Sequence, residues 1–195
     1  CFDLSYLSMM PNMTVLAPKN DRELEEMLVF AVSFDGPIAI RYPRGSAHQG
    51  LREYQAPVEY GRSEIIRKGK KIAVLGVGSM IPSCMEICKG LKDDGYDPTF
   101  VNARFVKPLD VDLLDELAKD HSLFVTVEEN VKSGGYGEHV SAYMEACHPE
   151  IRVLSAAVWD RFVPQGNVES LRSRIGLGVE DIRQAIEDSE ELREQ

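Results

Sequence analysis

The 195-residue sequence lacks several features that define common classes of protein. It has no excess of positive charge, because 22 basic residues stand against 32 acidic ones, and this argues against nucleic acid as a partner. It contains no apolar run of about 18 residues, so we expect no membrane span. It also lacks an initiator methionine and a signal-peptide pattern, and we expect it to be part of a longer protein.

Cysteine and histidine are few and scattered. Cys84 and Cys88 are expected on one apolar helix face and Cys147 on another, where cysteines pack as small hydrophobic residues rather than as a disulfide framework. None of the histidines lies in an HExxH or CxxH motif, so we expect no metal site. These features favour a reducing, cytoplasmic compartment.

Apolar runs and amphipathic periods alternate along the chain. Short apolar runs predict strands at residues 14–17, 37–40, 71–75, 99–103, 123–127 and 151–158. Helical periods follow Asn20 and Asp110, both predicted helix caps, and occupy residues 79–94 and 137–147, and two further helices close the chain. This alternation predicts an α/β fold with a mostly parallel sheet.

A polar connector at residues 48–57 divides the chain into two units, residues 1–56 and 57–195. The first unit contains only two predicted strands and the helix between them, which makes a poor sheet. We therefore expect it to be the remnant of a larger domain. The second unit has enough strands and helices for an α/β domain of its own.

The run Arg41-Tyr-Pro-Arg-Gly45 is the most informative motif. It follows a predicted buried strand, and ligands of open α/β sheets bind at the carboxyl ends of strands. Arginine's planar fork suits phosphate or carboxylate, and Pro43 and Gly45 shape the loop that holds the second guanidinium. The alternative is an ordinary surface pair of arginines flanking a turn.

Two other glycine-containing stretches are weaker candidates. Gly76-Val-Gly78-Ser79 follows a strand, but Ile81 replaces the third glycine of a dinucleotide fingerprint, so we favour a tight structural turn. Glu128-Glu-Asn130 ends a predicted strand and precedes Gly134-Gly135. These carboxylates suit acid–base chemistry, subunit contacts or plain solvation, and the glycines suit an anion at a helix N-terminus. We favour a structural or interface role.

Several strings, in this order, resemble the 1-deoxy-D-xylulose-5-phosphate synthases among the thiamine-diphosphate-dependent transketolases. They span nearly the whole chain, and the RFVKPLD and DRFVPQG strings are the most specific to that family. The matching pieces are Phe2-Asp-Leu-Ser-Tyr-Leu7, Pro11-Asn-Met13, Ile40-Arg-Tyr-Pro-Arg-Gly45, Arg104-Phe-Val-Lys-Pro-Leu-Asp110, Val127-Glu-Glu-Asn130 and Asp160-Arg-Phe-Val-Pro-Gln-Gly166.

The resemblance implies a cytoplasmic homodimeric enzyme that joins pyruvate to D-glyceraldehyde 3-phosphate with loss of CO2, using thiamine diphosphate and Mg2+. It also implies two domains: residues 1–56 as the C-terminal part of the pyrimidine-binding domain, and residues 57–195 as the C-terminal domain, a three-layer α/β/α unit. Rival readings are another enzyme of the superfamily, such as a transketolase or a 2-oxoacid dehydrogenase β-subunit, and a non-catalytic dimerisation module.

The chain lacks the family's motifs for the cofactor and for catalysis. The resemblance therefore implies no catalytic, cofactor-binding or metal-binding residue here, and residues 1–195 alone are expected to be inactive. One site residue carries over: Arg44, which matches the position that binds the phosphate of glyceraldehyde 3-phosphate. Arg41, earlier in the same motif, is expected to be structural.

Overall fold

The computed structural model describes residues 1–189. The first unit comprises α1 (Asp3–Ser8), β1 (Thr14–Leu16), α2 (Asp21–Ser33) and β2 (Ile38–Ile40). The later strands are β3 (Glu64–Arg67), β4 (Lys71–Gly76), β5 (Thr99–Asn102), β6 (Phe105–Lys107), β7 (His121–Val131) and β8 (Arg152–Val158). The later helices are η1 (Gly78–Met80), α3 (Ile81–Asp93), α4 (Val111–Leu117), α5 (Tyr136–Cys147), α6 (Val168–Arg174) and α7 (Val179–Glu187). None of these helices is long and apolar enough to cross a membrane.

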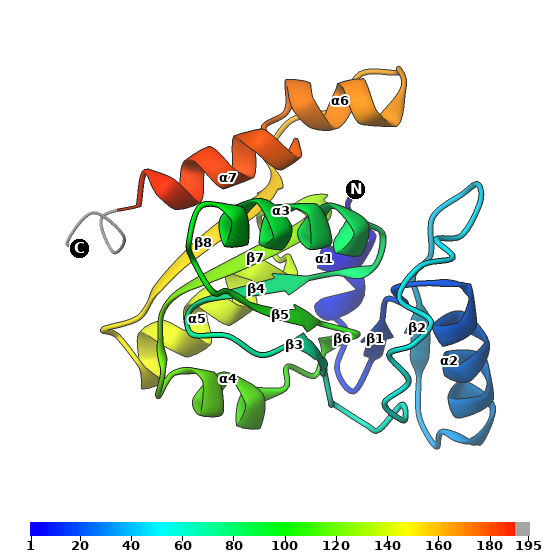
Figure 1. Cartoon of the computed structure of the whole chain (residues 1–195). Helices are drawn as coiled ribbons and strands as arrows, with labels where there is room; N and C mark the ends of the chain where they lie inside the picture. Colours follow the sequence, from blue (N-terminus) through cyan, green and yellow to red (C-terminus); the bar gives the residue numbers. More distant parts are fainter. Residues whose placement is uncertain (190–195) are drawn as a thin grey trace.

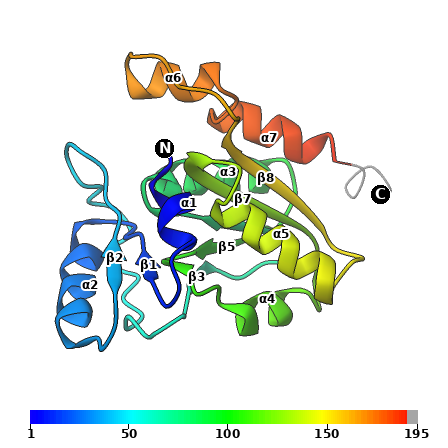
Figure 2. The same cartoon turned by 180° about the vertical axis from the view of Figure 1, so that it is seen from behind.

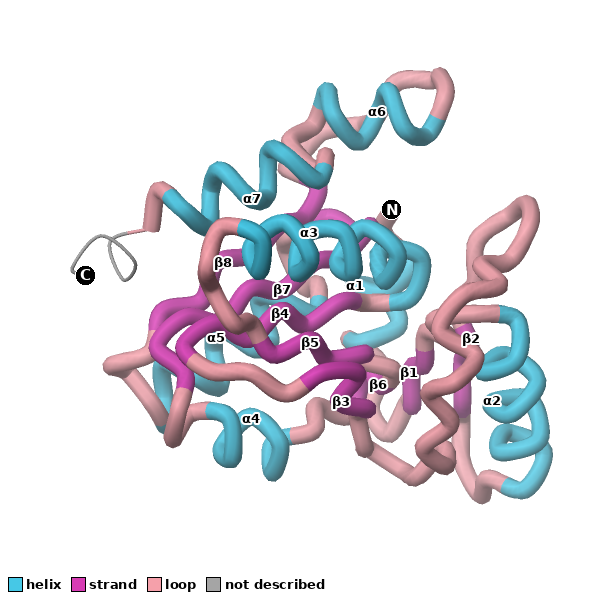
Figure 3. The backbone as a smooth tube through the Cα atoms, viewed as in Figure 1, coloured by secondary structure: helices cyan, strands magenta, loops and turns pink. Residues whose placement is uncertain are grey.

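The larger of two sheets has five strands in the order β3-β5-β4-β7-β8. All of its pairs are parallel except β3 with β5. Helices α3 and α7 cover one face, and α4 and α5 cover the other (Figures 1 and 3). This is the predicted three-layer α/β/α arrangement with a mostly parallel sheet, and the prediction of fold class is confirmed.

The two faces of the sheet follow from the alternation of side chains along each strand. In β4, Ile72 and Val74 pack toward α3, while Ala73 and Leu75 pack in the other cluster, with α4 and α5. A strand with apolar residues on both faces has to be covered by helices on both sides. The long apolar strands therefore dictate the layers.

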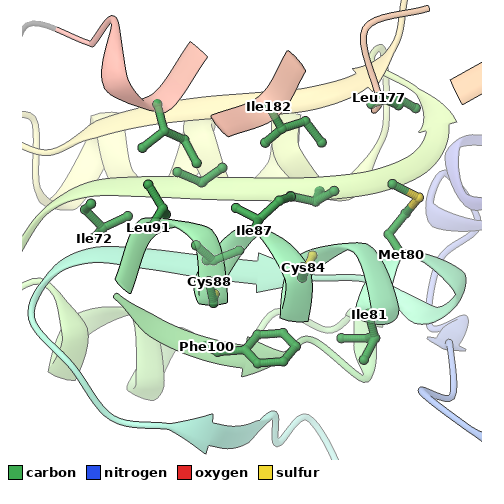
Figure 4. Packing of buried hydrophobic residues seen from close by; sticks show 14 of the residues in the cluster. Ile72, Met80, Ile81, Cys84, Ile87, Cys88, Leu91, Phe100, Leu177 and Ile182 are labelled. Atoms are coloured by element: carbon green, nitrogen blue, oxygen red, sulfur yellow. The ribbon is translucent and has the colours of Figure 1, made fainter. Parts of the chain in front are cut away.

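The predicted helix 79–94 begins as η1 and continues as α3, and its cysteines lie in the core. Cys84 and Cys88 pack between α3 and the sheet (Figure 4), and burial raises the pKa of Cys88 to about 12. Both are free thiols that behave as small hydrophobic residues, as predicted. The prediction for Cys147 is wrong, because this last residue of α5 is exposed.

The second sheet, in the order β2-β1-β6, joins the two units. Strands β1 and β2 are parallel and connected by α2, as predicted for a β-α-β unit. Strand β6 of the second unit pairs antiparallel with β1. No strand was predicted at residues 105–107, because their pairing partner, β1, comes from the other unit and no local pattern signals the pairing. The first unit thus completes its small sheet with a strand from the second.

The N-terminus of α2 has the predicted cap. The Asn20 side chain accepts a hydrogen bond from the backbone N–H of Glu23 at 2.9 Å. In a capping box, Glu23 would reach back to the N–H of Asn20. Instead, its carboxylate accepts from the N–H of Lys19 at 2.6 Å. The carboxylate lies one residue further back because it also takes part in a buried group of charges.

That group, the buried charge cluster, consists of Lys19, Glu23, Glu64 and Arg104. Lys19 Nζ lies 3.0 Å from Glu23 and 2.7 Å from Glu64. Arg104 Nη2 lies 3.0 Å from each of the same two carboxylates. The four side chains are only 1–4 % exposed. Two residues come from each unit, so the cluster bridges both.

Neighbouring groups add hydrogen bonds to the cluster, although the buried Arg104 Nε has no hydrogen-bond partner among the described residues. Asn102 donates to both carboxylates, at 2.8 Å to Glu23 and 3.3 Å to Glu64. Arg104 Nη1 donates to the carbonyls of Ala56 and Pro57. Burial alone raises the pKa of Glu64, but the hydrogen bonds from Lys19 and Ala56 and the charge of Arg104 outweigh it, so this pKa is lower than usual. The buried carboxylate is therefore ionised.

We expect Glu23→Gln to destabilise the chain by about 3 kcal/mol or more, because it leaves two buried cations with one carboxylate. Glu26→Gln on the same helix is the matched control. Glu26 pairs with Arg22 at the surface, and its loss should cost about 0.5 kcal/mol or less. Urea unfolding of both variants measures the difference. Equal losses would contradict a dominant role for the cluster.

Candidate functional site

The arginine motif begins where β2 ends. Arg41 N–H donates to the carbonyl of Leu16 at 2.8 Å and extends the pairing of β2 with β1 by one bond. Gly45 has φ +106°, a conformation that favours glycine. The sequence analysis therefore placed the loop correctly at a strand's carboxyl end.

The Arg41 guanidinium has three different partners. Its Nε donates to Asp3 of α1 at 3.1 Å, its Nη1 to the hydroxyl of Ser79 at 3.2 Å, and its Nη2 to the carbonyl of Glu129 at 3.1 Å. These partners come from α1, η1 and β7. A guanidinium used in this way fixes the position of its own backbone, which agrees with the structural role expected for Arg41.

Glu129 continues this network toward α6. Its Oε2 accepts from the Ser79 hydroxyl at 2.8 Å, and its Oε1 accepts from Arg172 Nε at 3.1 Å. Burial raises the pKa of Glu129, but Arg172, with Ser79 and Arg41, outweighs it, so this pKa is lower than usual. We call Asp3, Arg41, Ser79, Glu129 and Arg172 the arginine relay.

Arg44 differs from Arg41 in its exposure and in its hydrogen bonding. Its side chain is exposed, and among residues 1–189 it has no hydrogen bond and no ion pair. A guanidinium with all its donors open can bind an anion in two-pronged fashion. The loop thus carries one arginine that is fully used within the protein and one that is not.

Glu128 and Asn130, predicted to have a structural or interface role, have partners inside the chain. The strand that was expected to end at residue 127 continues to Val131, and its pairing with β8 shifts register between Val127 and Val131. Asn130 accepts from Leu4 N–H and donates to the Ser5 hydroxyl, so it holds α1. Both are buried.

The carboxylate of Glu128 occupies the N-terminus of α5. It accepts hydrogen bonds from the backbone N–H groups of Tyr136 at 2.9 Å and Gly137 at 2.8 Å. A Cβ atom at Gly135 would lie 2.6 Å from Glu128 Oε1, so the glycine makes room for this carboxylate. The anion that this helix end was considered able to receive is a side chain of the protein itself.

The Gly76–Ser79 stretch is a tight structural turn, as favoured from the sequence. A Cβ at Gly76 would lie 2.7 Å from Cys84 Sγ, and one at Gly78, where φ is +51°, would lie 3.0 Å from Ala17. The sequence did not predict that Ser79 lies beside Arg41 and Glu129. No local signal reveals it, because the three residues come from distant parts of the chain.

Comparison with known families agrees with this architecture. The family model described as the transketolase C-terminal domain matches residues 61–182, and that of the transketolase pyrimidine binding domain matches residues 1–49. The chain is therefore an α/β protein whose larger sheet is built as in transketolase C-terminal domains. The first match covers more than half of the chain, and the chain belongs to the transketolase family.

Relatives named 1-deoxy-D-xylulose-5-phosphate synthase confirm the resemblance that the motifs indicated. One from Lachnoclostridium phytofermentans is 45 % identical over 182 residues, which is 93 % of this chain and 29 % of the relative. One from Dictyoglomus thermophilum is 41 % identical over 186 residues, or 95 % and 30 %. The chain thus spans less than a third of the length of these curated relatives.

Two solved structures share the fold. A structure described as a split gene transketolase, inactive beta4 tetramer, has a TM-score of 0.87 and 28 % identity over 98 % of this chain and 61 % of its own. Transketolase from Campylobacter jejuni has a TM-score of 0.71 over 95 % of this chain and 28 % of its own. Its identity is 17 %, so this second likeness concerns the fold alone.

We expect Glu128 to make stability depend on pH. Burial raises its pKa to about 7, from 4.5, against the opposing N–H groups of Gly137 and Tyr136 and the charge of Arg41, while Glu138 adds to the rise. Between these values the unfolded chain releases the proton and the folded chain keeps it. Stability therefore falls as pH rises through this window, and is flat above it.

From pH 5 to pH 8, the wild type should lose about 2–3 kcal/mol relative to Glu128→Gln. Denaturant titrations across this range measure the difference. Glu180→Gln on α7, where the side chain is 81 % exposed, should follow the wild type. Parallel curves for wild type and Glu128→Gln would refute the assignment to Glu128.

Proposed function

We propose that the chain is part of a 1-deoxy-D-xylulose-5-phosphate synthase, a thiamine-diphosphate-dependent transferase. The enzyme condenses pyruvate with D-glyceraldehyde 3-phosphate and releases CO2, and its product serves isoprenoid, thiamine and pyridoxal biosynthesis. The proposal includes a cytoplasmic homodimer. It is supported by the identity to relatives of that name, which extends over more than nine tenths of this chain.

Within that enzyme, Arg44 is the residue that binds the phosphate of glyceraldehyde 3-phosphate. The observation that carries this role is the contrast within one loop. The Arg41 guanidinium donates to Asp3, Ser79 and Glu129. The guanidinium of Arg44, three residues later, donates to none of the described residues. An open guanidinium on a loop with an anchored base is suited to a doubly charged phosphate.

The described residues do not fit the diphosphate cofactor or its Mg2+. Within residues 1–189, no group of three or more His, Cys, Asp or Glu residues could hold a metal ion. The glycine-preceded N-terminus of α5, which resembles a diphosphate site in outline, is filled by Glu128. In this proposal the cofactor is held by other parts of the enzyme.

A second candidate is a role in assembly without catalysis. Helix α2 exposes an apolar stripe in which Leu28 is 52 %, Val29 74 % and Val32 90 % exposed. Apolar patches of this kind mark protein interfaces. The solved relative described as a beta4 tetramer adds weight to self-association. Sedimentation of the 195-residue chain with and without Val32→Glu distinguishes a chain that associates through α2 from one that does not.

In a synthase that contains these residues, we expect Arg44→Ala to raise the KM for glyceraldehyde 3-phosphate and leave the KM for pyruvate unchanged. Losing a charge-assisted contact of about 1.5–3 kcal/mol corresponds to roughly 10- to 150-fold. Arg52→Ala is the matched control, because Arg52 is an exposed arginine that already pairs with Asp21. An unchanged KM in Arg44→Ala would remove Arg44 from the site.

We expect the purified 195-residue chain to give no turnover with pyruvate, glyceraldehyde 3-phosphate, Mg2+ and thiamine diphosphate. The reason is that the resemblance places the family's cofactor and catalytic motifs outside these residues. Release of CO2 followed by a coupled assay measures this. Turnover by the pure chain would contradict both the assignment of the cofactor to other residues and the absence of catalytic residues here.

A further inference from the structure

A continuous line of hydrogen bonds joins α6 to the arginine loop. Arg172 of α6 donates to Glu129 Oε1 at 3.1 Å, Ser79 donates to Glu129 Oε2 at 2.8 Å, and Arg41 donates to Ser79 at 3.2 Å. Figures 1 and 2 show α6 and the loop after β2 on the same side of the molecule as the N-terminus. Segments far apart in sequence thus meet in one relay.

A short stretch of backbone links the arginine relay to Arg44. Arg41 is fixed at its backbone by Leu16 and at its guanidinium by Asp3, Ser79 and Glu129. Only Tyr42 and Pro43 separate it from Arg44, and proline restricts the backbone between them. Since Arg44 has no hydrogen bond or ion pair among the described residues, Arg41 is the nearest residue of the loop with such an anchor.

The other end of the relay is helix α6. It has no buried residue of its own, and the next residue, Ile175, lies in the core. Arg172 ties α6 to the rest of the chain, with Nε on Glu129 and Nη2 at 3.5 Å from the carbonyl of Ser79. Without Arg172, the Glu129 carboxylate would keep only the Ser79 hydroxyl as a side-chain donor among the described residues, and it would be less firmly oriented toward Ser79.

We propose that Glu129 and Arg172 are positioning residues for Arg44, so that docking of α6 orders the phosphate-binding loop. The ligand class is a phosphate monoester, and in this respect the inference rests on the proposed function. The coupling between α6 and the loop is a property of the chain itself and is open to measurement without any ligand.

The test uses the full 195-residue chain labelled with 15N. Backbone order parameters of residues 42–46 and the Nε–H signal of Arg41 are recorded for the wild type, Glu129→Gln, Arg172→Ala and Arg172→Lys. Glu180→Gln on α7 is the matched control, because this exposed glutamate pairs with Arg183 and, within residues 1–189, lies outside the arginine relay. Thermal unfolding of each variant separates a local loss of order from general destabilisation.

We expect Glu129→Gln and Arg172→Ala to lower the order parameters of residues 42–46 and to shift the Arg41 signal, with unchanged order in the central strands. Arg172→Lys, which keeps the charge beside Glu129, should restore part of the order, and Glu180→Gln should match the wild type. Unchanged order in Arg172→Ala, or loss of order spread evenly over the chain, would overturn the proposal.

A titration with inorganic phosphate at constant ionic strength separates this inference from the proposed function. If Arg44 binds phosphate, the relay variants should weaken binding by roughly 2- to 30-fold relative to the wild type. If phosphate leaves the Arg44 signals of the wild type unmoved, the phosphate-binding role fails. The order parameters still decide whether α6 positions the loop.

Discussion

The buried charge cluster is the constraint on which the arrangement of this chain depends. Two cations and two carboxylates lie almost wholly out of water between the first unit and the second. Removing such charges from water costs several kcal/mol for each ion, and only close pairing offsets the cost. The cluster therefore tolerates one relative placement of the units. It acts less as a source of stability than as a condition of correct docking.

Strand β7 also uses polar side chains to join separate elements of the chain. At the point where its pairing with β8 shifts, three consecutive polar side chains are each used within the protein. Glu128 caps α5, Glu129 joins Arg41 to α6, and Asn130 holds α1. A buried polar group without a partner is costly, so the shift in register is coupled to the elements that supply these partners. Hydrogen bonds therefore tie together the elements next to the arginine loop, while Arg44 in that loop has no hydrogen bond or ion pair among the described residues.

Much of the fold was predictable because its signals are local. Long apolar strands such as β4 and β8, and the helices beside them, follow from periods of two and of 3.6 residues. The caps at Asn20 and Asp110 follow from side chains that accept hydrogen bonds from nearby N–H groups. Strand β6 was missed because its partner, β1, lies in the other unit, and the exposure of Cys147 was missed because a helix end is not covered like its centre.

The sequence by itself determined the α/β class, the order of the main strands, the position of the arginine loop and the family to which the chain is similar. These features depend on residues close together in the chain. Only the tertiary structure decided which charge meets which. Arg41 pairs with Asp3 across 38 positions, and Arg172 pairs with Glu129 across 43. Ion pairs depend on distance in space, which a linear pattern does not encode. The same distances decided that Arg41 is held and that Arg44 has no hydrogen bond or ion pair among the described residues.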